Sequence, residues 1–224
     1  MKVTYYVDGV DFKTMGVTVT ASRGLLNSLK RREPLKAVWP DHHGEVVDLA
    51  KPRFEAREIV LDCIITAASS TELIAATQLF AAAWSSAGTK RLLVDVNDGV
   101  TGMKPLIYEV FLTEEIVISK KWRAASALAS FKLSLREPEP IKMVYKLGAA
   151  LVNDYTASFE ITSLEPINIY WGDGTSTKDV MPVAGTPITH VYPSTIAWYN
   201  IVITGVIEDV VVVATNTTLV WAKL

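Results

Sequence analysis

Two closely spaced prolines near the middle of the chain interrupt its most regular strand pattern. Before them, apolar and polar residues alternate over 127–136, as expected for a strand with one buried face. Proline has no amide donor for a strand ladder and holds the preceding residue extended, so the Glu-Pro-Glu-Pro sequence at 137–140 ends that strand. We therefore expect a domain boundary here, between a first domain over residues 1–140 and a second over 141–224.

The composition favours a folded, strand-rich protein. Half of the residues are hydrophobic and 21% are charged, so the chain can bury a substantial core. Valine, isoleucine, threonine and tyrosine are abundant, and these residues favour strands over helices. The net charge of −2 gives no general attraction to nucleic acid or to an anionic membrane. No apolar run approaches the length of a membrane span.

In the first domain the sequence predicts several strands and one helix. The helix begins near Ser69 and Glu72, whose spacing is that of a capping box. Apolar and small residues follow at helical intervals, at Leu73, Ala76, Thr77, Phe80 and Trp84. Strands are expected near 1–7, 17–20, 54–66, 91–96, 106–112 and 127–136. We predict a β-sandwich or half-barrel that carries one amphipathic helix.

A long segment of the first domain, residues 22–51, has no regular periodicity. Unpatterned segments of this length inside a compact domain are usually functional. We therefore expect the segment to contact other subunits. The residues expected to make these contacts are Lys30, Arg31, Arg32, Trp39, His42 and His43.

The basic run of this segment, at 30–32, has more than one interpretation. It could touch a nucleic-acid backbone, especially if a ring of subunits threads DNA through its lumen. The simpler interpretations are a solvated loop, or pairing with acidic residues of a neighbouring subunit. We do not expect nucleic acid as a partner.

The Asp-His-His-Gly-Glu sequence at 41–45 contains imidazole and carboxylate groups, which are ligands of zinc and iron. Adjacent side chains on a strand point to opposite faces, and the third histidine, His190, belongs to the second domain. A polar loop is therefore the simpler interpretation, and we expect neither a metal nor a cofactor.

No arrangement of residues in the sequence indicates catalysis. A hydrolytic triad needs a nucleophile beside a histidine and a third, orienting group, and no such context is present. The single cysteine, Cys63, excludes an internal disulfide and lies in the apolar run 59–65, where a buried and inert thiol is expected. We predict a protein that is not an enzyme.

Three motifs of the second domain occur in a characteristic order. An aromatic residue precedes Gly-Asp-Gly at 171–174, a His-x-Tyr motif follows at 190–192, and an alternating strand begins at Tyr199. Together they resemble the PKD-type immunoglobulin-like domain, although no glycine precedes Tyr199 as is common in that family. The residues that carry the resemblance are Trp171, Gly172, Asp173, Gly174, His190 and Tyr192.

The local chemistry agrees with this resemblance. Gly-Asp-Gly favours a tight turn with positive φ, in which the side chain of Asp173 can bind backbone amides. His190 and Tyr192 are expected to close the sandwich through side-chain hydrogen bonds. A lone carboxylate in a turn is a poor calcium site, so the turn is the simpler role for Asp173. Domains of this family are usually spacers or interaction modules, so the resemblance implies no chemistry.

The first domain resembles the N-terminal domain of tailed-phage distal tail proteins and the related tail-tube fold. The resemblance rests on the order of elements: an opening strand ending in Val-Asp-Gly-Val at 7–10, a long loop reaching 40–44, a strand over 57–66, one helix, a hairpin and an alternating last strand. It implies a β-sandwich with one helix that assembles into six-fold rings. An appended immunoglobulin-like domain is common in phage tail and capsid proteins.

These resemblances predict a structural component of a phage or prophage tail, either a distal tail protein or a tube-like ring protein. Its expected partners are copies of itself, forming a ring such as a hexamer, and other tail proteins, but no membrane. The opening residues lack the apolar core of a secretory signal, so we expect the chain to be cytoplasmic during assembly and then part of the virion tail. The alternative is a bacterial surface or carbohydrate-associated protein that binds through its PKD-like domain.

Overall fold

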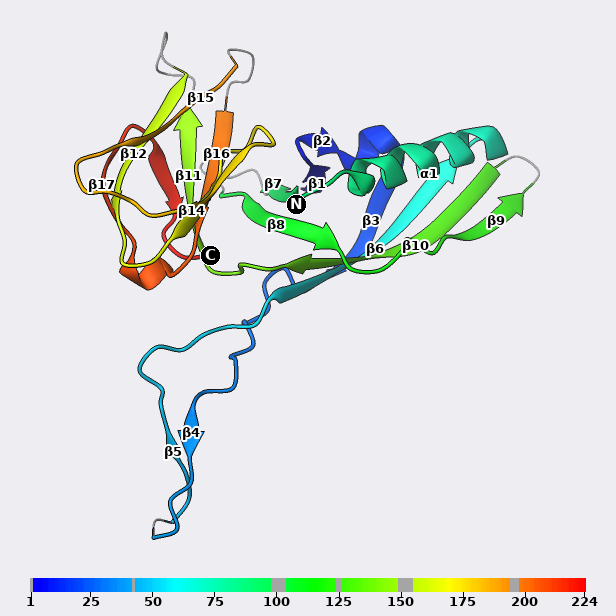
Figure 1. The fold of residues 1–224 in the computed structure, drawn as a ribbon. Helices are drawn as coiled ribbons and strands as arrows, with labels where there is room; N and C mark the ends of the chain where they lie inside the picture. Colours follow the sequence, from blue (N-terminus) through cyan, green and yellow to red (C-terminus); the bar gives the residue numbers. More distant parts are fainter. Residues whose placement is uncertain (1, 42, 98–103, 124–125, 149–154, 194–197) are drawn as a thin grey trace.

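The computed structural model describes residues 2–41, 43–97, 104–123, 126–148, 155–193 and 198–224 (Figure 1). The described residues are mainly in strands and include one α-helix, which confirms the predicted mainly β fold. His42 and most of the connection between the strands expected near 91–96 and 106–112 lie outside the described residues.

The N-terminal part is built on an eight-stranded antiparallel sheet with the order β2-β1-β7-β8-β10-β6-β3, in which β9 also pairs with β10. Its strands are β1 (Lys2–Val7), β2 (Val10–Asp11), β3 (Val17–Arg23), β6 (Arg57–Ala67), β7 (Lys90–Asn97), β8 (Leu106–Leu112), β9 (Ser119–Arg123) and β10 (Ser126–Glu137). β8 and β10 pair at two positions, Leu135 with Leu112 and Arg136 with Phe111. The sheet therefore consists of two halves that are joined through a short ladder.

The longest ladder joins β6 to β10 and supplies the centre of the core. It runs from the pair Arg57–Glu137 to the pair Ala67–Ala127. Along β10 the odd-numbered residues from 127 to 137 are buried, as the alternation predicted. Cys63 of β6 is buried in the same core, and burial raises the pKa of its thiol to about 12. The cysteine is therefore a thiol, not a thiolate, at physiological pH.

Helix α1 (Ser70–Ser85) covers one face of β6 and β10 (Figure 1). It begins where the capping residues predicted, since Glu72 N donates to Ser69 Oγ (3.2 Å) and Ala68 N donates to Glu72 Oε2 (3.0 Å). Phe80 packs edge-on against Phe12 of the short 3-10 helix η1 (Phe12–Met15), with ring centroids 5.1 Å apart. The helix thus closes the core of the N-terminal part.

The outer face of α1 is unusual for a helix at a protein surface. Glu72 is its one charged residue, and Ile74 and Leu79 are more than half exposed. The helix therefore buries one face, as predicted, but lacks the charged opposite face that an amphipathic surface helix normally has.

Between β3 and β6 the chain leaves the body as an extended arm, defined here as residues 26–55 (Figure 1). Its two sides pair at the root, residues 30–32 and 52–55, where Arg32 N donates to Arg53 O (2.8 Å) and Glu55 N donates to Lys30 O (2.8 Å). Further out, β4 (Lys36–Ala37) pairs with β5 (Val46–Val47). The tip, beyond this ladder, comprises residues 38–41 and 43–45. The segment without periodicity is thus a thin two-stranded ribbon.

The C-terminal part is a sandwich of two antiparallel sheets. One sheet has the order β14-β13-β16-β11-β18 and the other β15-β12-β17. Their strands are β11 (Lys142–Gly148), β12 (Thr156–Thr162), β13 (Ile167–Tyr170), β14 (Ser176–Val180), β15 (Ile188–Val191), β16 (Trp198–Thr204), β17 (Val211–Thr215) and β18 (Thr218–Trp221). A second apolar core, which includes Phe159, Trp171 and Ile201, fills the space between the sheets.

The two parts contact each other through an apolar patch beside the main cores. Ile107 of β8 packs with Val144 of β11, Tyr170 of β13 and Val202 of β16. Trp221 of β18 packs at the same patch and donates from Nε1 to Pro105 O (3.0 Å). The outer face of the five-stranded sheet therefore lies against the hairpin of β7 and β8.

Two neighbouring residues of α1 test how this core contributes to stability. Phe80 is 1% exposed, whereas Leu79 is 55% exposed. We expect Phe80→Ala to lower the free energy of unfolding by about 3–5 kcal/mol, because it leaves a cavity among packed rings. Leu79→Ala, the control, should change it by less than about 0.5 kcal/mol. The measurement is urea denaturation of both variants; equal losses would contradict the assigned packing of the helix.

Candidate functional site: the interface between the two parts and the arm root

A buried ion cluster lies where the chain passes from the first part to the second. Glu137 is the last residue of β10 and Lys142 the first of β11, and both side chains are almost fully buried. Lys142 Nζ lies beside Glu137 Oε1, and Arg57 Nε lies 3.1 Å from Glu137 Oε2. Burial lowers the pKa of Lys142, although its contact with Glu137 opposes that shift. A buried carboxylate thus sits between two cations.

The same cluster reaches the start of the arm. Arg57 Nη1 donates to Leu25 O (2.8 Å), and Tyr108 OH donates to the same carbonyl (2.7 Å). The ring of Tyr108 also lies under the ammonium of Lys142, 4.6 Å from it. The exit of the arm and the junction between the two parts are therefore held by one set of contacts.

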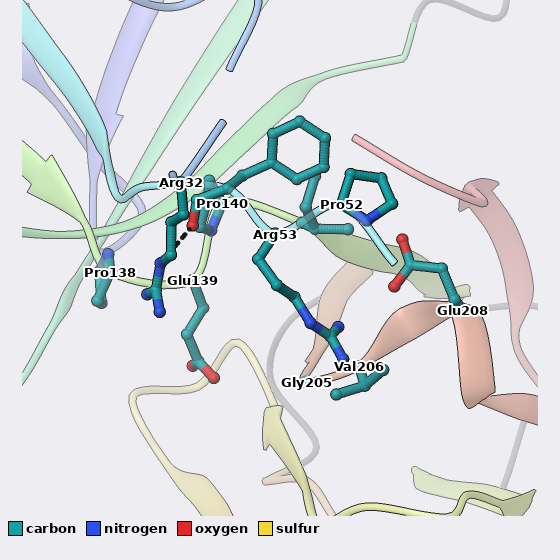
Figure 2. Close-up of a pocket in the computed structure, with 11 residues that line it drawn as sticks. Arg32, Pro52, Arg53, Pro138, Glu139, Pro140, Gly205, Val206 and Glu208 are labelled. Atoms are coloured by element: carbon teal, nitrogen blue, oxygen red, sulfur yellow. Dashed lines mark hydrogen bonds between the residues drawn. The ribbon is translucent and has the colours of Figure 1, made fainter. Parts of the chain in front are cut away.

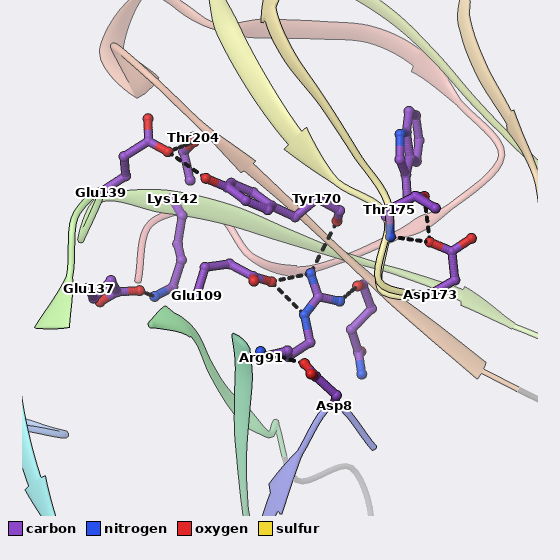
Figure 3. Close-up of polar contacts among 12 residues, drawn as sticks. Asp8, Arg91, Glu109, Glu137, Glu139, Lys142, Tyr170, Asp173, Thr175 and Thr204 are labelled. Atoms are coloured by element: carbon purple, nitrogen blue, oxygen red, sulfur yellow. Dashed lines mark hydrogen bonds and ion pairs between the residues drawn. The ribbon is translucent and has the colours of Figure 1, made fainter. Parts of the chain in front are cut away.

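Arg91 of β7 makes a second set of contacts across the interface (Figure 3). Its Nε donates to Glu109 Oε1 (2.6 Å), and its terminal nitrogens donate to the main-chain carbonyls of Tyr170 and Asn200. Its own backbone amide donates to Asp8 Oδ1 (2.8 Å). One guanidinium thus links β7 and β8 to β13 and β16.

The proline-rich junction is fixed by Glu139. Its carboxylate accepts hydrogen bonds from Asn168 Nδ2 (2.8 Å), Tyr170 OH (3.0 Å) and Thr204 Oγ1 (2.9 Å), as Figure 3 shows in part. These partners belong to the five-stranded sheet or directly adjoin it. The junction is therefore docked on the C-terminal sandwich and is not a free linker.

The Gly-Asp-Gly motif forms a compact turn after β13. Gly172 and Gly174 have φ values of 97° and 90°. Thr175 N donates to Asp173 Oδ1 (2.9 Å), and Asp173 Oδ2 lies 2.8 Å from His190 Nε2. A Cβ atom at Gly172 would lie 2.5 Å from Arg91 Nη1, so glycine here also lets the arginine approach.

The rings of the same motif form a stack at the end of the sandwich. Trp171 lies parallel to His190 with centroids 4.7 Å apart, and Tyr192 packs edge-on against His190 at 4.6 Å. Tyr192 OH donates to Trp171 O (2.8 Å). Burial alone would raise the pKa of Asp173, but the hydrogen bonds from Thr175 and His190 hold that pKa below its usual value. The motif makes internal contacts that stabilise the fold.

The predicted subunit contacts divide between the two ends of the arm. At the root, Lys30 pairs with Glu55 of the same chain (2.9 Å), and Arg32 Nε donates to Phe54 O (3.0 Å). Arg31 faces Phe54 across the ladder. At the tip, Trp39 and His43 are exposed. The structure therefore places the basic group and the aromatic group far apart on one arm.

A pocket of about 270 Å³ opens at the root (Figure 2). Arg32, Pro52, Arg53 and Phe54 line it from the arm, and the rest of its wall comes from the junction 138–141 and the loop 205–208. Lys51 Nζ lies 3.7 Å from Asp209 Oδ2, and this salt bridge also holds the root beside the sandwich. Sequence reasoning missed this pocket because its walls come from three distant segments.

The described residues contain no group of three or more His, Cys, Asp and Glu side chains that could hold a metal ion. In the same residues no helix is long and apolar enough to span a membrane. Within the described residues, the arm root is rich in arginine and lysine, and the arm exposes large apolar side chains.

No family model and no curated protein sequence matches the chain. Among solved structures, it is similar to the crystal structure of the Dit protein of phage SPP1, described as a paradigm of the hub adsorption apparatus in phages that infect Gram-positive bacteria. The two chains are 14% identical, with a TM-score of 0.48 over 86% of this chain and 75% of that chain. At this score the likeness assigns neither a family nor a function.

The ion cluster can be tested on strand β11. Lys142→Met should lower the free energy of unfolding by about 2–4 kcal/mol, because it removes one of the two cations that compensate buried Glu137. Lys146→Met is the control, since this lysine lies on the ring of Trp198 at the half-exposed end of the same strand. It should cost about 1 kcal/mol or less. Thermal and urea unfolding measure both, and equal effects would contradict the cluster.

The turn motif gives a pH-dependent prediction. Asp173→Asn should lower the free energy of unfolding by about 1–2 kcal/mol at neutral pH. Because the folded pKa lies below the value of about 3.9 for an unfolded aspartate, the contribution of Asp173 is present above that value and is lost as the pH falls through the folded pKa. Urea titrations of both proteins should therefore converge below about pH 4. A difference that persists unchanged into strong acid would contradict this assignment.

Proposed function

We propose that this chain is a structural subunit of a phage or prophage tail, of the distal tail or tube-like ring class. In this proposal it acts through geometry and assembly, by forming a ring with copies of itself and by contacting other tail proteins. Residues 1–140 would form the ring, and residues 141–224, a PKD-like immunoglobulin-type domain, would lie at its outside. The proposal is supported by the order of elements in the first part and, above all, by the arm.

The arm exposes several large apolar side chains. Its exposed large apolar side chains include Leu35, which is 81% exposed, and Trp39, which is 58% exposed. The others are Leu26, Val38, Val46 and Leu49. A two-stranded ribbon alone is marginally stable, and a contiguous exposed apolar patch usually marks an interaction surface. The arm is therefore suited to being covered by another protein surface.

Other surfaces of the chain also suit assembly. The outer face of α1 carries Ile74 and Leu79 beside uncharged residues. On the C-terminal sandwich, Val211 and Val213 are exposed on β17, which is an edge strand of the three-stranded sheet. Edge strands offer unpaired main-chain groups to a neighbouring chain. These surfaces are candidates for contacts with other tail proteins.

The rigid junction fits this role. A subunit of a ring needs a constant shape, because a closed assembly repeats the same contact at every interface. The contacts of Glu137, Lys142, Arg91 and Glu139 hold the sandwich in one orientation on the N-terminal part. The outer domain would therefore be presented at a fixed angle around the ring.

Deletion of the arm tests the proposal. The strands of the root pair at Arg32 and Arg53, so residues 34–51 can be replaced by a short Gly-Ser turn while Leu25 and its contacts are kept. We expect the complete chain to form a closed oligomer, measured by light scattering and seen as rings in negative stain. The shortened chain should be a folded monomer with a cooperative unfolding transition. A monomeric complete chain, or an oligomeric shortened chain, would contradict the proposal.

A further inference from the structure

Charge is divided between the two ends of the arm. Three arginines at the root, Arg31, Arg32 and Arg53, make no salt bridge in the described part of the chain, whereas the lysines Lys30 and Lys51 do. The tip carries two carboxylates, Asp41 and Glu45, and neither makes a salt bridge with another described residue. The two ends of one arm are therefore complementary in charge.

The root pocket leaves its arginines available to a further anion. Arg32 uses Nε on Phe54 O, and Arg53 extends across the pocket towards Val206 (Figure 2). The two carboxylates in the wall already have donors: Glu139 binds three side chains of the sandwich, and Glu208 pairs with Lys223 at 2.6 Å. An incoming carboxylate would therefore meet the guanidinium groups of Arg32 and Arg53, neither of which forms a salt bridge with a described residue, although the charge of Arg53 also acts on Glu208.

The lining of the pocket suits a segment that carries an aromatic residue beside a carboxylate. Its apolar walls include Pro52, Phe54, Pro138 and Pro140. In the tip, Trp39 precedes Pro40 and Asp41, so an exposed indole and a carboxylate lie two residues apart where the chain turns. A buried aromatic anchor beside an arginine-bound carboxylate is a common centre of protein interfaces.

The tip cannot occupy the pocket of its own chain. From Arg32 to Asp41 an extended chain spans about 30 Å, at about 3.3 Å per residue. The ladder of β4 and β5 holds the arm open, with the tip far from the root (Figure 1). A tip that meets a root pocket must therefore belong to another copy.

We propose that the tip of each arm docks in the root pocket of the next copy, with the tip carboxylates on Arg32 and Arg53 and Trp39 against the proline walls. This inference rests on the proposed ring function and specifies its contact. Such a contact is head-to-tail, so it closes into a ring when the rotation between copies allows closure. Because exposed ion pairs contribute, the assembly should weaken as salt is raised.

Charge reversal of either end tests the contact. The root variant carries Arg32→Glu and Arg53→Glu, the tip variant carries Asp41→Lys and Glu45→Lys, and the control carries Lys13→Glu and Lys132→Glu at exposed positions away from the arm. Each variant alone is expected to be monomeric by light scattering, while the control assembles like the wild type. In an equimolar mixture, the unchanged tip of the root variant meets the unchanged root of the tip variant. The other contact pairs the lysine tip with the glutamate root, so its charges are exchanged but still opposite. Mixing should therefore restore assembly, to a heterodimer of about twice the chain mass of 24.6 kDa or larger.

Assembly of the mixture also shows that the variants are folded, since the root variant must supply a working tip and the tip variant a working root pocket. Variants that assemble alone, or a mixture that stays monomeric while the wild type forms oligomers, would overturn the docking contact. If arm deletion still abolishes assembly in that case, the ring proposal stands and the tip binds another surface or another protein. If the arm-deleted chain assembles, the ring proposal itself fails.

Discussion

The structure depends on a buried carboxylate held between two cations at the junction of its two parts. Glu137 ends the longest strand of the first part, and Lys142 begins the second part four residues after the first of two prolines. Neither group can remain charged in an apolar interior without the other, so the two parts must meet in one arrangement. A buried ion pair adds little net stability over apolar residues, but it penalises every arrangement in which a partner is missing.

Arg57 extends this constraint to the arm. It pairs with Glu137 and also binds the carbonyl of Leu25, the last buried residue before the arm leaves the body. Gly24 allows that exit, since a Cβ atom there would lie 1.9 Å from Glu58 O. The direction of the arm, the docked junction and the root pocket are thus consequences of the same few contacts, and a pocket between three segments can form only when all of them hold.

The arm and the outer face of α1 share a property that the interior does not explain. Both expose large apolar side chains, and the helix has a single charged residue. These exposed apolar side chains do not stabilise the folded single chain, because apolar surface contributes favourable free energy only when it is removed from water, here by a partner surface. This is the physical reason for treating the molecule as a component of an assembly.

Much of the fold could be predicted from the sequence. The alternation along β10, the capping residues of α1 and the Gly-Asp-Gly turn all depend on side-chain spacing over a few residues. Strand β9 was not predicted, because its sequence Ser-Lys-Lys-Trp-Arg has no apolar alternation. The candidate site was less accessible to such reasoning. The basic run that includes Arg31 and Arg32 was found, but the pairing of Arg32 with Arg53 in the wall of one pocket was not.

The sequence by itself determined most of the long strands of the first part, where the helix starts and that the regular strand pattern ends at Glu137. Only the tertiary structure decided that Glu137 and Lys142 are buried, that Glu139 docks the junction, and that segment 22–51 projects as a ribbon with acidic and basic ends. The difference has a physical cause. The alternation of apolar and polar residues can be seen in a few neighbouring positions of the sequence. The ion-pair partner of a charged residue and the exposure of a side chain depend on segments that are distant in sequence and meet only when the chain folds.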